Sequence, residues 1–211
     1  MKSLTLVQSL DSKNELNVNI RKPLKGHRSP YLLDWEGNPV MFNKSYYLDP
    51  YAYLRRGLAY ETYLGEEFVL LQNEGSTGYG QPIKFTRFIE DHTSECINIG
   101  DWVIIKAVYP SGEIDKDYFT YSQTPFVPGV KLSGLPIVPH HPDESQIWIP
   151  EILPEELPED INSAPDLLNF FTIKNKYTRG YLSYEITPGK SWLNAKTDNI
   201  QKETLWRLIP E

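Results

Sequence analysis

The sequence predicts an all-β domain built from three similar units, and two observations carry this prediction. The first is a recurring aromatic anchor that opens an alternating run: Phe85, Trp148 and Trp206 lie 63 and 58 residues apart. The second is the abundance of short alternating apolar runs, separated by turns that draw on 17 Pro and 13 Gly. Alternation over a few residues is typical of half-buried strands, and a long fixed period indicates a repeat architecture.

Each anchor follows a short motif in which an apolar residue stands two positions before a tyrosine. The motifs are Leu58-Ala59-Tyr60, Phe119-Thr120-Tyr121 and Leu182-Ser183-Tyr184. An opening strand is expected in each unit, at 39–42, 102–106 and 170–174. Units of about four strands cannot bury their apolar faces alone. Three of them stacked around a pseudo-threefold axis would close a barrel without exposed edges, which is the β-trefoil.

The chain of 211 residues is expected to form one such domain with an N-terminal extension. We place the extension at residues 1–31 and the β-trefoil at 32–211, with units at approximately 32–95, 96–160 and 161–211. The extension carries a basic cluster, Arg21 to Arg28, which is expected to be solvated. The segment 151–166 is rich in carboxylates and proline and is expected to be a solvated acidic connector.

Charge and composition exclude several classes of partner. A formal net charge of −7 disfavours nucleic acid and anionic membranes, and no stretch approaches the ~20 apolar residues of a membrane span. Cys96 is the only cysteine, so no intramolecular disulfide is possible. Because the first residues also lack the apolar core of a signal peptide, a cytoplasmic location is slightly favoured. The oligomeric state stays open.

No pattern of catalytic or cofactor-binding residues is visible, so we expect a binding protein rather than an enzyme, without a cofactor. His140 and His141, with Asp143 and Glu144, are the one candidate for a metal site. Adjacent residues on an extended chain point in opposite directions, so this pair is not expected to chelate a metal. Cys96 is expected to be a packed thiol.

The stretch 32–85 carries motifs of a known family. Its opening residues at fixed offsets are Leu32, Asp34, Gly37, Val40, Tyr46 and Leu48, and the blocks at 56–58, 65–66, 69–72 and 80–85 follow in order. In these residues the chain resembles the soybean-trypsin-inhibitor (Kunitz) family. The resemblance implies the same β-trefoil, and it implies inhibition of a protease by a substrate-like surface loop.

The resemblance implies that this loop lies between Thr86 and Glu95. Arg87 is its one basic residue and would suit a trypsin-like pocket, whereas a register two residues later would present Ile89. With Phe88 between them, and Asn43 close to the family's loop-supporting asparagine, which itself aligns with Phe42, these are the candidate inhibitory residues. The family usually has two disulfides, and Phe68 stands at one of the cysteine positions.

Four alternatives stay open. Arg87 could simply pair with a nearby carboxylate (Glu90, Asp91 or Glu95), or a cysteine protease could be engaged by the loops at 52–56 or 73–81. A carbohydrate-binding module is the second class, because Gln146 and Trp148 match the Gln-x-Trp pattern of ricin-type lectins, where that motif is largely structural. The third class is a docking module for a protein partner.

Overall fold

The computed structural model describes residues 29–76, 78–87, 94–110, 116–122, 124, 129–134, 143–155, 157–162, 167, 169–187 and 189–211. Strands dominate these ranges. They are β1 (Ser45–Pro50), β2 (Leu58–Tyr63), β3 (Glu66–Leu71), β4 (Ile83–Arg87), β5 (Val103–Ala107), β6 (Tyr118–Tyr121), β7 (Val130–Ser133), β8 (Trp148–Ile152), β9 (Phe171–Asn175), β10 (Tyr181–Thr187), β11 (Lys190–Thr197) and β12 (Trp206–Pro210). A short helix, α2 (Glu159–Asn162), and two 3₁₀ turns, η1 (Glu144–Gln146) and η2 (Lys202–Thr204), complete the described elements.

Six of the strands close a barrel. β1 pairs with β4, β4 with β5, β5 with β8, β8 with β9, β9 with β12, and β12 returns to β1, always antiparallel. Each third of the chain contributes two of these strands. Closure leaves no barrel strand with an unpaired edge, as the three-unit pattern predicts.

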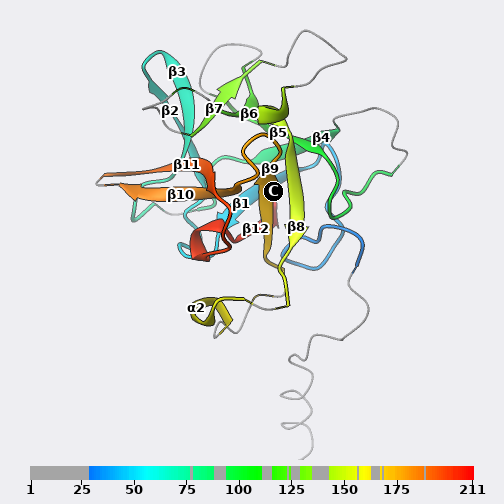
Figure 1. Cartoon of the computed structure of the whole chain (residues 1–211). Coiled ribbons are helices and arrows are strands. Elements are labelled where there is room, and N and C mark those ends of the chain that lie inside the picture. Colours follow the sequence, from blue (N-terminus) through cyan, green and yellow to red (C-terminus); the bar gives the residue numbers. More distant parts are fainter. Residues whose placement is uncertain are drawn as a thin grey trace, which may run out of the picture.

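The other six strands form three hairpins at one end of the barrel. They are β2–β3, β6–β7 and β10–β11, and β3 joins them by pairing with both β7 and β11. In Figure 1 these hairpins occupy the left and upper side of the molecule, while the barrel strands run through its centre. The architecture is the β-trefoil that the sequence predicts.

The aromatic anchors of the second and third units occupy equivalent places. Trp148 pairs with Val103, and Trp206 pairs with Phe171. Both tryptophans are fully buried. The indole nitrogen Nε1 of Trp148 donates to the carbonyl of Phe119 at 3.1 Å, and that of Trp206 donates to the carbonyl of Leu182 at 2.8 Å. The acceptors are the first residues of the predicted repeat motifs.

The first unit does not align with the other two as the sequence predicts. Its residue at this position is Ile83, which pairs with Tyr46 and Ala107. Phe85 is also fully buried, but it lies two residues further along β4, opposite Ile105. The predicted match of Phe85 with the two tryptophans is therefore wrong by two residues.

Two glycines of the first unit allow a close approach of backbones. A Cβ at Gly57 would lie 1.6 Å from the carbonyl oxygen of Tyr79, and one at Gly80, where φ is +75°, would lie 2.3 Å from the carbonyl oxygen of Leu58. Leu58 and Gly80 form a parallel bridge. Only glycine fits at such contacts, which explains why both positions belong to sequence motifs.

The first unit differs from the sequence prediction. The expected opening strand at 39–42 is not a strand: Pro39 and Met41 form isolated bridges with Leu33 and Cys96, and the barrel strand β1 begins only at Ser45. The openings of the other two units are shifted by one residue from the expected ranges. Residues 1–28 of the expected N-terminal extension lie outside the described residues, including the basic cluster.

The acidic segment 151–166 was expected to be a solvated connector, and its described part is more than that. Ile161 is fully buried in a small cluster with Phe170 and Leu205, and Leu153 and Leu157 pack against this cluster. The carboxylates of this part remain on the outside, as the exposed side chains of Glu155, Glu159 and Asp160 show. Apolar residues spaced four apart therefore pack the segment into this cluster. Glu156 and Asp166 lie outside the described residues.

No helix in the described ranges is long and apolar enough to span a membrane. Within the same ranges, no group of three or more His, Cys, Asp or Glu side chains is arranged to hold a metal ion. The histidine pair His140 and His141 lies outside them.

Candidate functional site: the loop after β4

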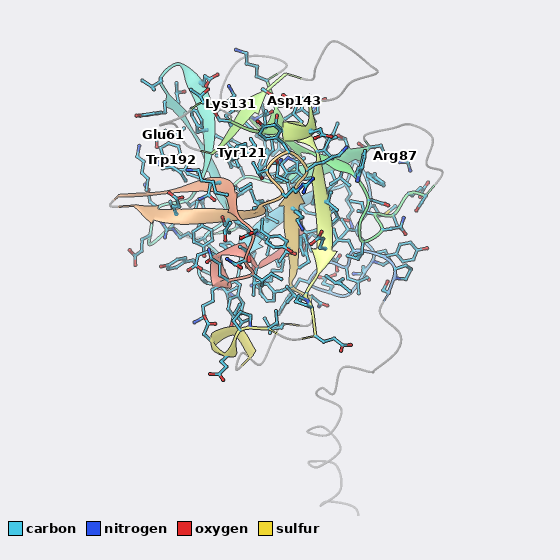
Figure 2. The ribbon with its side chains drawn as sticks, in the orientation of Figure 1. Glu61, Arg87, Tyr121, Lys131, Asp143 and Trp192 are labelled. Carbon is cyan, nitrogen blue, oxygen red and sulfur yellow. The ribbon has the colours of Figure 1, made fainter. Side chains whose placement is uncertain are left out.

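The candidate inhibitory loop begins where β4 ends, at Arg87, and the described chain resumes at Ser94. Of the candidate residues, Phe88 and Ile89 lie outside the described residues. Arg87 is on the opposite side of the molecule from Glu61 and Trp192, which belong to the hairpin end (Figure 2). Arg87, the last described residue before the loop, therefore lies away from the β2–β3 and β10–β11 hairpins (Figure 2).

Backbone hydrogen bonds tie both ends of the loop to the segment that precedes β1. The amide of Asn43 donates to the carbonyl of Phe85 at 2.9 Å, and the amide of Phe42 donates to the carbonyl of Glu95 at 3.0 Å. Beyond the loop, the amide of Ile97 donates to the carbonyl of Val40 at 2.9 Å. We call this set of backbone contacts the stem, and it holds the two ends of residues 88–93 next to each other.

The side chain of Arg87 folds back onto the stem. Its Cζ lies 5.0 Å from the centroid of the Phe42 ring, and its NH2 group donates to the carbonyl oxygen of Ser94. The side chain is half-buried, and its Nε is buried with no hydrogen-bond acceptor among the described residues. None of the ion pairs formed by described residues includes Arg87, so the predicted alternative of pairing with Glu95 is not what the structure shows. The other two candidate partners, Glu90 and Asp91, lie outside the described residues.

The sequence suggests that the side chain of Asn43 supports the loop, but in the structure the side chain of Phe42 contacts the loop base instead. Asn43 has a φ of +62°, a left-handed conformation that asparagine tolerates, and its side chain is exposed and makes no hydrogen bond among the described residues. Its contribution to the stem is its backbone amide. The side chain that reaches the loop base is Phe42, through its contact with Arg87.

Two further groups stiffen the stem. The hydroxyl of Ser94 donates to the carbonyl of Cys96 at 2.8 Å, and the amide of Cys96 donates back to that hydroxyl at 3.2 Å. The hydroxyl of Tyr46 accepts a 3.0 Å hydrogen bond from the amide of Met41. Burial raises the pKa of Tyr46, so this phenol stays neutral and keeps its place in the core.

The candidate sugar-binding residues are in the interior. Trp148 is fully buried, and Gln146 is 4% exposed. The amide nitrogen of Gln146 donates to the hydroxyls of Thr120 and Ser133 and to the carbonyl of Gly134, at 2.9 to 3.0 Å. A sugar ring cannot stack on a buried indole, so both residues hold the second unit together and offer no surface to a ligand.

The alternative loop at 52–56 is exposed and braced from within. Tyr53 and Leu54 are 36% and 53% exposed. The amide of Arg55 donates to a carboxylate oxygen of Asp49 at 2.6 Å, and the guanidinium of Arg56 lies over the Tyr53 ring at 5.3 Å. In the loop at 73–81 the ring of Tyr79 packs against that of Tyr47, with centroids 5.8 Å apart, and Thr77 lies outside the described residues.

One exposed apolar feature escaped the sequence prediction. At the turn between β2 and β3, Tyr63 is 42% and Leu64 is 76% exposed. Behind this turn, Phe68 is fully buried and packs edge-on against Tyr63 and Trp192, with ring centroids 6.2 Å apart in each pair. Phe68 thus fills its position with apolar bulk, as expected. The exposed apolar turn could have been predicted from Leu64, because this leucine stands directly before the turn glycine Gly65.

Comparisons with known proteins support the fold. No family model matches the chain, and no curated protein matches it. Among solved structures it is similar to alocasin, a protease inhibitor from giant taro (Arum macrorrhizon), with 14% identity and a TM-score of 0.65 over 87% of this chain and all of that one. It is also similar to the rice (Oryza sativa) bifunctional α-amylase/subtilisin inhibitor, with 13% identity and a TM-score of 0.61 over 85% and 99% of the two chains.

A third similar structure is not described as an inhibitor. The binding domain of botulinum neurotoxin serotype D is 15% identical, with a TM-score of 0.63 over 86% of this chain and 45% of that one. At these identities the likeness concerns the fold alone, which is the β-trefoil. The similar structures are inhibitors and binding proteins.

Proposed function

We propose that this protein inhibits a protease by presenting the segment after β4 as a substrate-like loop. The observation that carries the proposal is the stem, which ties both ends of residues 88–93 to the segment 40–43 by backbone hydrogen bonds. A loop whose ends are fixed loses little conformational entropy on binding, and after cleavage its two ends stay in place for religation. Binding loops carried by a rigid scaffold are a common arrangement in proteins.

The test is inhibition of trypsin, chymotrypsin, subtilisin and papain by the purified full chain. We expect tight, reversible inhibition of at least one serine protease. Replacing residues 88–93 by six Gly and Ser residues should abolish it while leaving the unfolding transition in place. The matched control is the same replacement of residues 73–78, in a turn that is not part of the stem, and this variant should still inhibit.

The two variants also separate the alternatives. If the 73–78 replacement loses inhibition and the 88–93 replacement keeps it, the inhibitory loop lies elsewhere in the trefoil. If the native chain inhibits none of the four enzymes at micromolar concentration, the proposal is contradicted. A carbohydrate-binding function draws no support from Gln146 and Trp148, because both are buried.

A further inference from the structure

Arg87 stands at the base of the loop and its side chain turns inward. A side chain that enters the pocket of a partner must point away from its own protein, with its charged end free. The guanidinium of Arg87 instead donates to the carbonyl of Ser94, at the other end of the loop. It thereby bridges the two ends of residues 88–93 with a side-chain hydrogen bond in addition to those of the stem.

Phe42 holds the guanidinium from below. The Phe42 ring lies 5.0 Å from Cζ of Arg87, a distance at which a cation is attracted to the face of an aromatic ring. The amide of Phe42 also donates to the carbonyl of Glu95, next to Ser94. Arg87, Phe42 and the Ser94–Glu95 backbone therefore form one closed set of contacts across the loop base.

Withdrawing Arg87 into a partner would break both of its contacts at once. It would uncover the face of Phe42 and leave the carbonyl of Ser94 without this donor, and buried polar groups without partners are costly. The segment 88–93 contains no other Lys or Arg, and its apolar residues are Phe88 and Ile89. A partner pocket built around an acidic group would find no basic side chain there.

We propose that Arg87 is a positioning residue that braces the loop, and that the loop suits a protease with an apolar primary pocket. The second part rests on the proposed function, whereas the first concerns the free protein. The brace predicts that Arg87 and Phe42 act as one unit. It also predicts that trypsin, whose pocket binds Lys or Arg, is not the target.

The first test needs no protease. Amide hydrogen exchange of residues 42 and 97, whose amides bond across the stem, should be about tenfold faster in Arg87→Ala and in Phe42→Ala, because opening of the stem becomes easier. The double variant should exchange no faster than either single one. In Arg87→Lys the exchange rates should lie between those of the native chain and of Arg87→Ala, because the lysine ammonium keeps the charge but not the planar guanidinium group. Arg179→Ala, in the exposed loop between β9 and β10, is the control and should leave these amides unchanged.

The second test is inhibition by the same variants. We expect the native chain to inhibit chymotrypsin or subtilisin and not trypsin, and Arg87→Ala to weaken that inhibition about tenfold and to be cleaved faster, since a loosened loop behaves as a substrate. Unchanged exchange in Arg87→Ala overturns the brace. Tight trypsin inhibition that Arg87→Ala abolishes overturns the apolar pocket. Faster exchange without inhibition of any enzyme leaves the brace standing and contradicts the proposed function alone.

Discussion

At the scale of single residues, we expect the buried pair of Asp49 and Arg207 to contribute more to the stability of the fold than any surface charge. The two residues face each other across β1 and β12. Both Nε and NH2 of Arg207 lie 2.8 Å from one carboxylate oxygen of Asp49, while the amide of Arg55 lies 2.6 Å from the other. The guanidinium is also 4.1 Å from the centre of the Trp35 ring. The carboxylate thus has partners on both oxygens, and the cation is covered by an aromatic face.

Removing the carboxyl group of Asp49 should destabilise the protein strongly. Asp49→Ala leaves the guanidinium of Arg207 and the amide of Arg55 without their acceptor, which costs about 3–5 kcal/mol in the free energy of unfolding. The matched control is Asp117→Ala, because the pair of Asp117 with Lys106 is partly exposed and should contribute below about 1 kcal/mol. Urea denaturation of the three proteins measures both values. Equal losses in the two variants would contradict this assignment.

Asp49 also makes a prediction about pH. Burial raises the pKa of Asp49, an effect that the hydrogen bond and charge of Arg207 oppose without cancelling. The folded protein then holds this proton more tightly than the unfolded chain, whose aspartates titrate near pH ~3.9. The contribution of this group to stability is present below that pH and is lost as the pH rises through the folded pKa. Asp49→Asn should therefore flatten the pH dependence of unfolding in this window, and an unchanged profile would show that another group produces it.

At the scale of elements, the turn of the β2–β3 hairpin carries an unusual residue. Leu64 and Gly65 have φ values of +51° and +80°, which is the two-residue turn that fits the twist of a hairpin and favours Asn-Gly. A leucine in the left-handed region is strained by contact of its Cβ with the backbone. It is also largely exposed, so packing within the chain offsets little of this strain.

Leu64→Asn should therefore stabilise the fold, by about 1 kcal/mol, because asparagine adopts this conformation at lower cost. Arg179, with φ +60°, is an exposed position of the same kind, and Arg179→Asn should act in the same direction. Lys196→Asn, at an exposed strand position, is the control and should not stabilise. Thermal unfolding gives the order of the four proteins. A loss of stability in Leu64→Asn would mean that the leucine packs usefully against Tyr63 and Trp192.

The features that could be predicted from the sequence are those that depend on local patterns of residues. The alternating strands of the second and third units were predicted to within one residue, because apolar periodicity reports the barrel face directly. In the first unit the same signal at 39–42 marks a segment in which Val40 is buried and Pro39 and Met41 form isolated bridges, and periodicity does not distinguish a bridge from a strand. The packing of Ile161 and Leu157 under the acidic segment was also invisible, since charge dominates its composition.

The candidate site was predictable only in its position along the chain. The motif at 80–85 placed the loop after β4, but the role of Arg87 depends on Phe42, which precedes the first barrel strand. The two residues meet only when β1 pairs with β4 and the chain before β1 is laid along the loop base. A long-range contact of this kind leaves no local pattern in the sequence, and the side-chain identities alone suggested an arginine that is either free or paired with a nearby carboxylate.

At the scale of the whole molecule, the pseudo-threefold symmetry makes a prediction about energy as well as geometry. Trp148 and Trp206 are equally buried, and each indole donates one hydrogen bond to the first residue of its own repeat motif. The first unit has Ile83 in this place, which shows that the fold accommodates a smaller apolar side chain there. If the sequence repeat reflects real symmetry, the same substitution in different units should lower the free energy of unfolding by the same amount.

Trp148→Phe and Trp206→Phe should thus lower the free energy of unfolding by similar amounts, about 1–3 kcal/mol each, from a small cavity and one unsatisfied carbonyl. Trp35→Phe, at a 40% exposed position outside the barrel interior, is the control and should cost less than either. Urea denaturation measures the three values. The two tryptophans lie opposite the two ends of β9, at Asn175 and Phe171, so the double variant should lose the sum of the two single losses. Unequal costs, with one variant near the control, would mean that the barrel depends on one third of the chain and that the symmetry is geometric only.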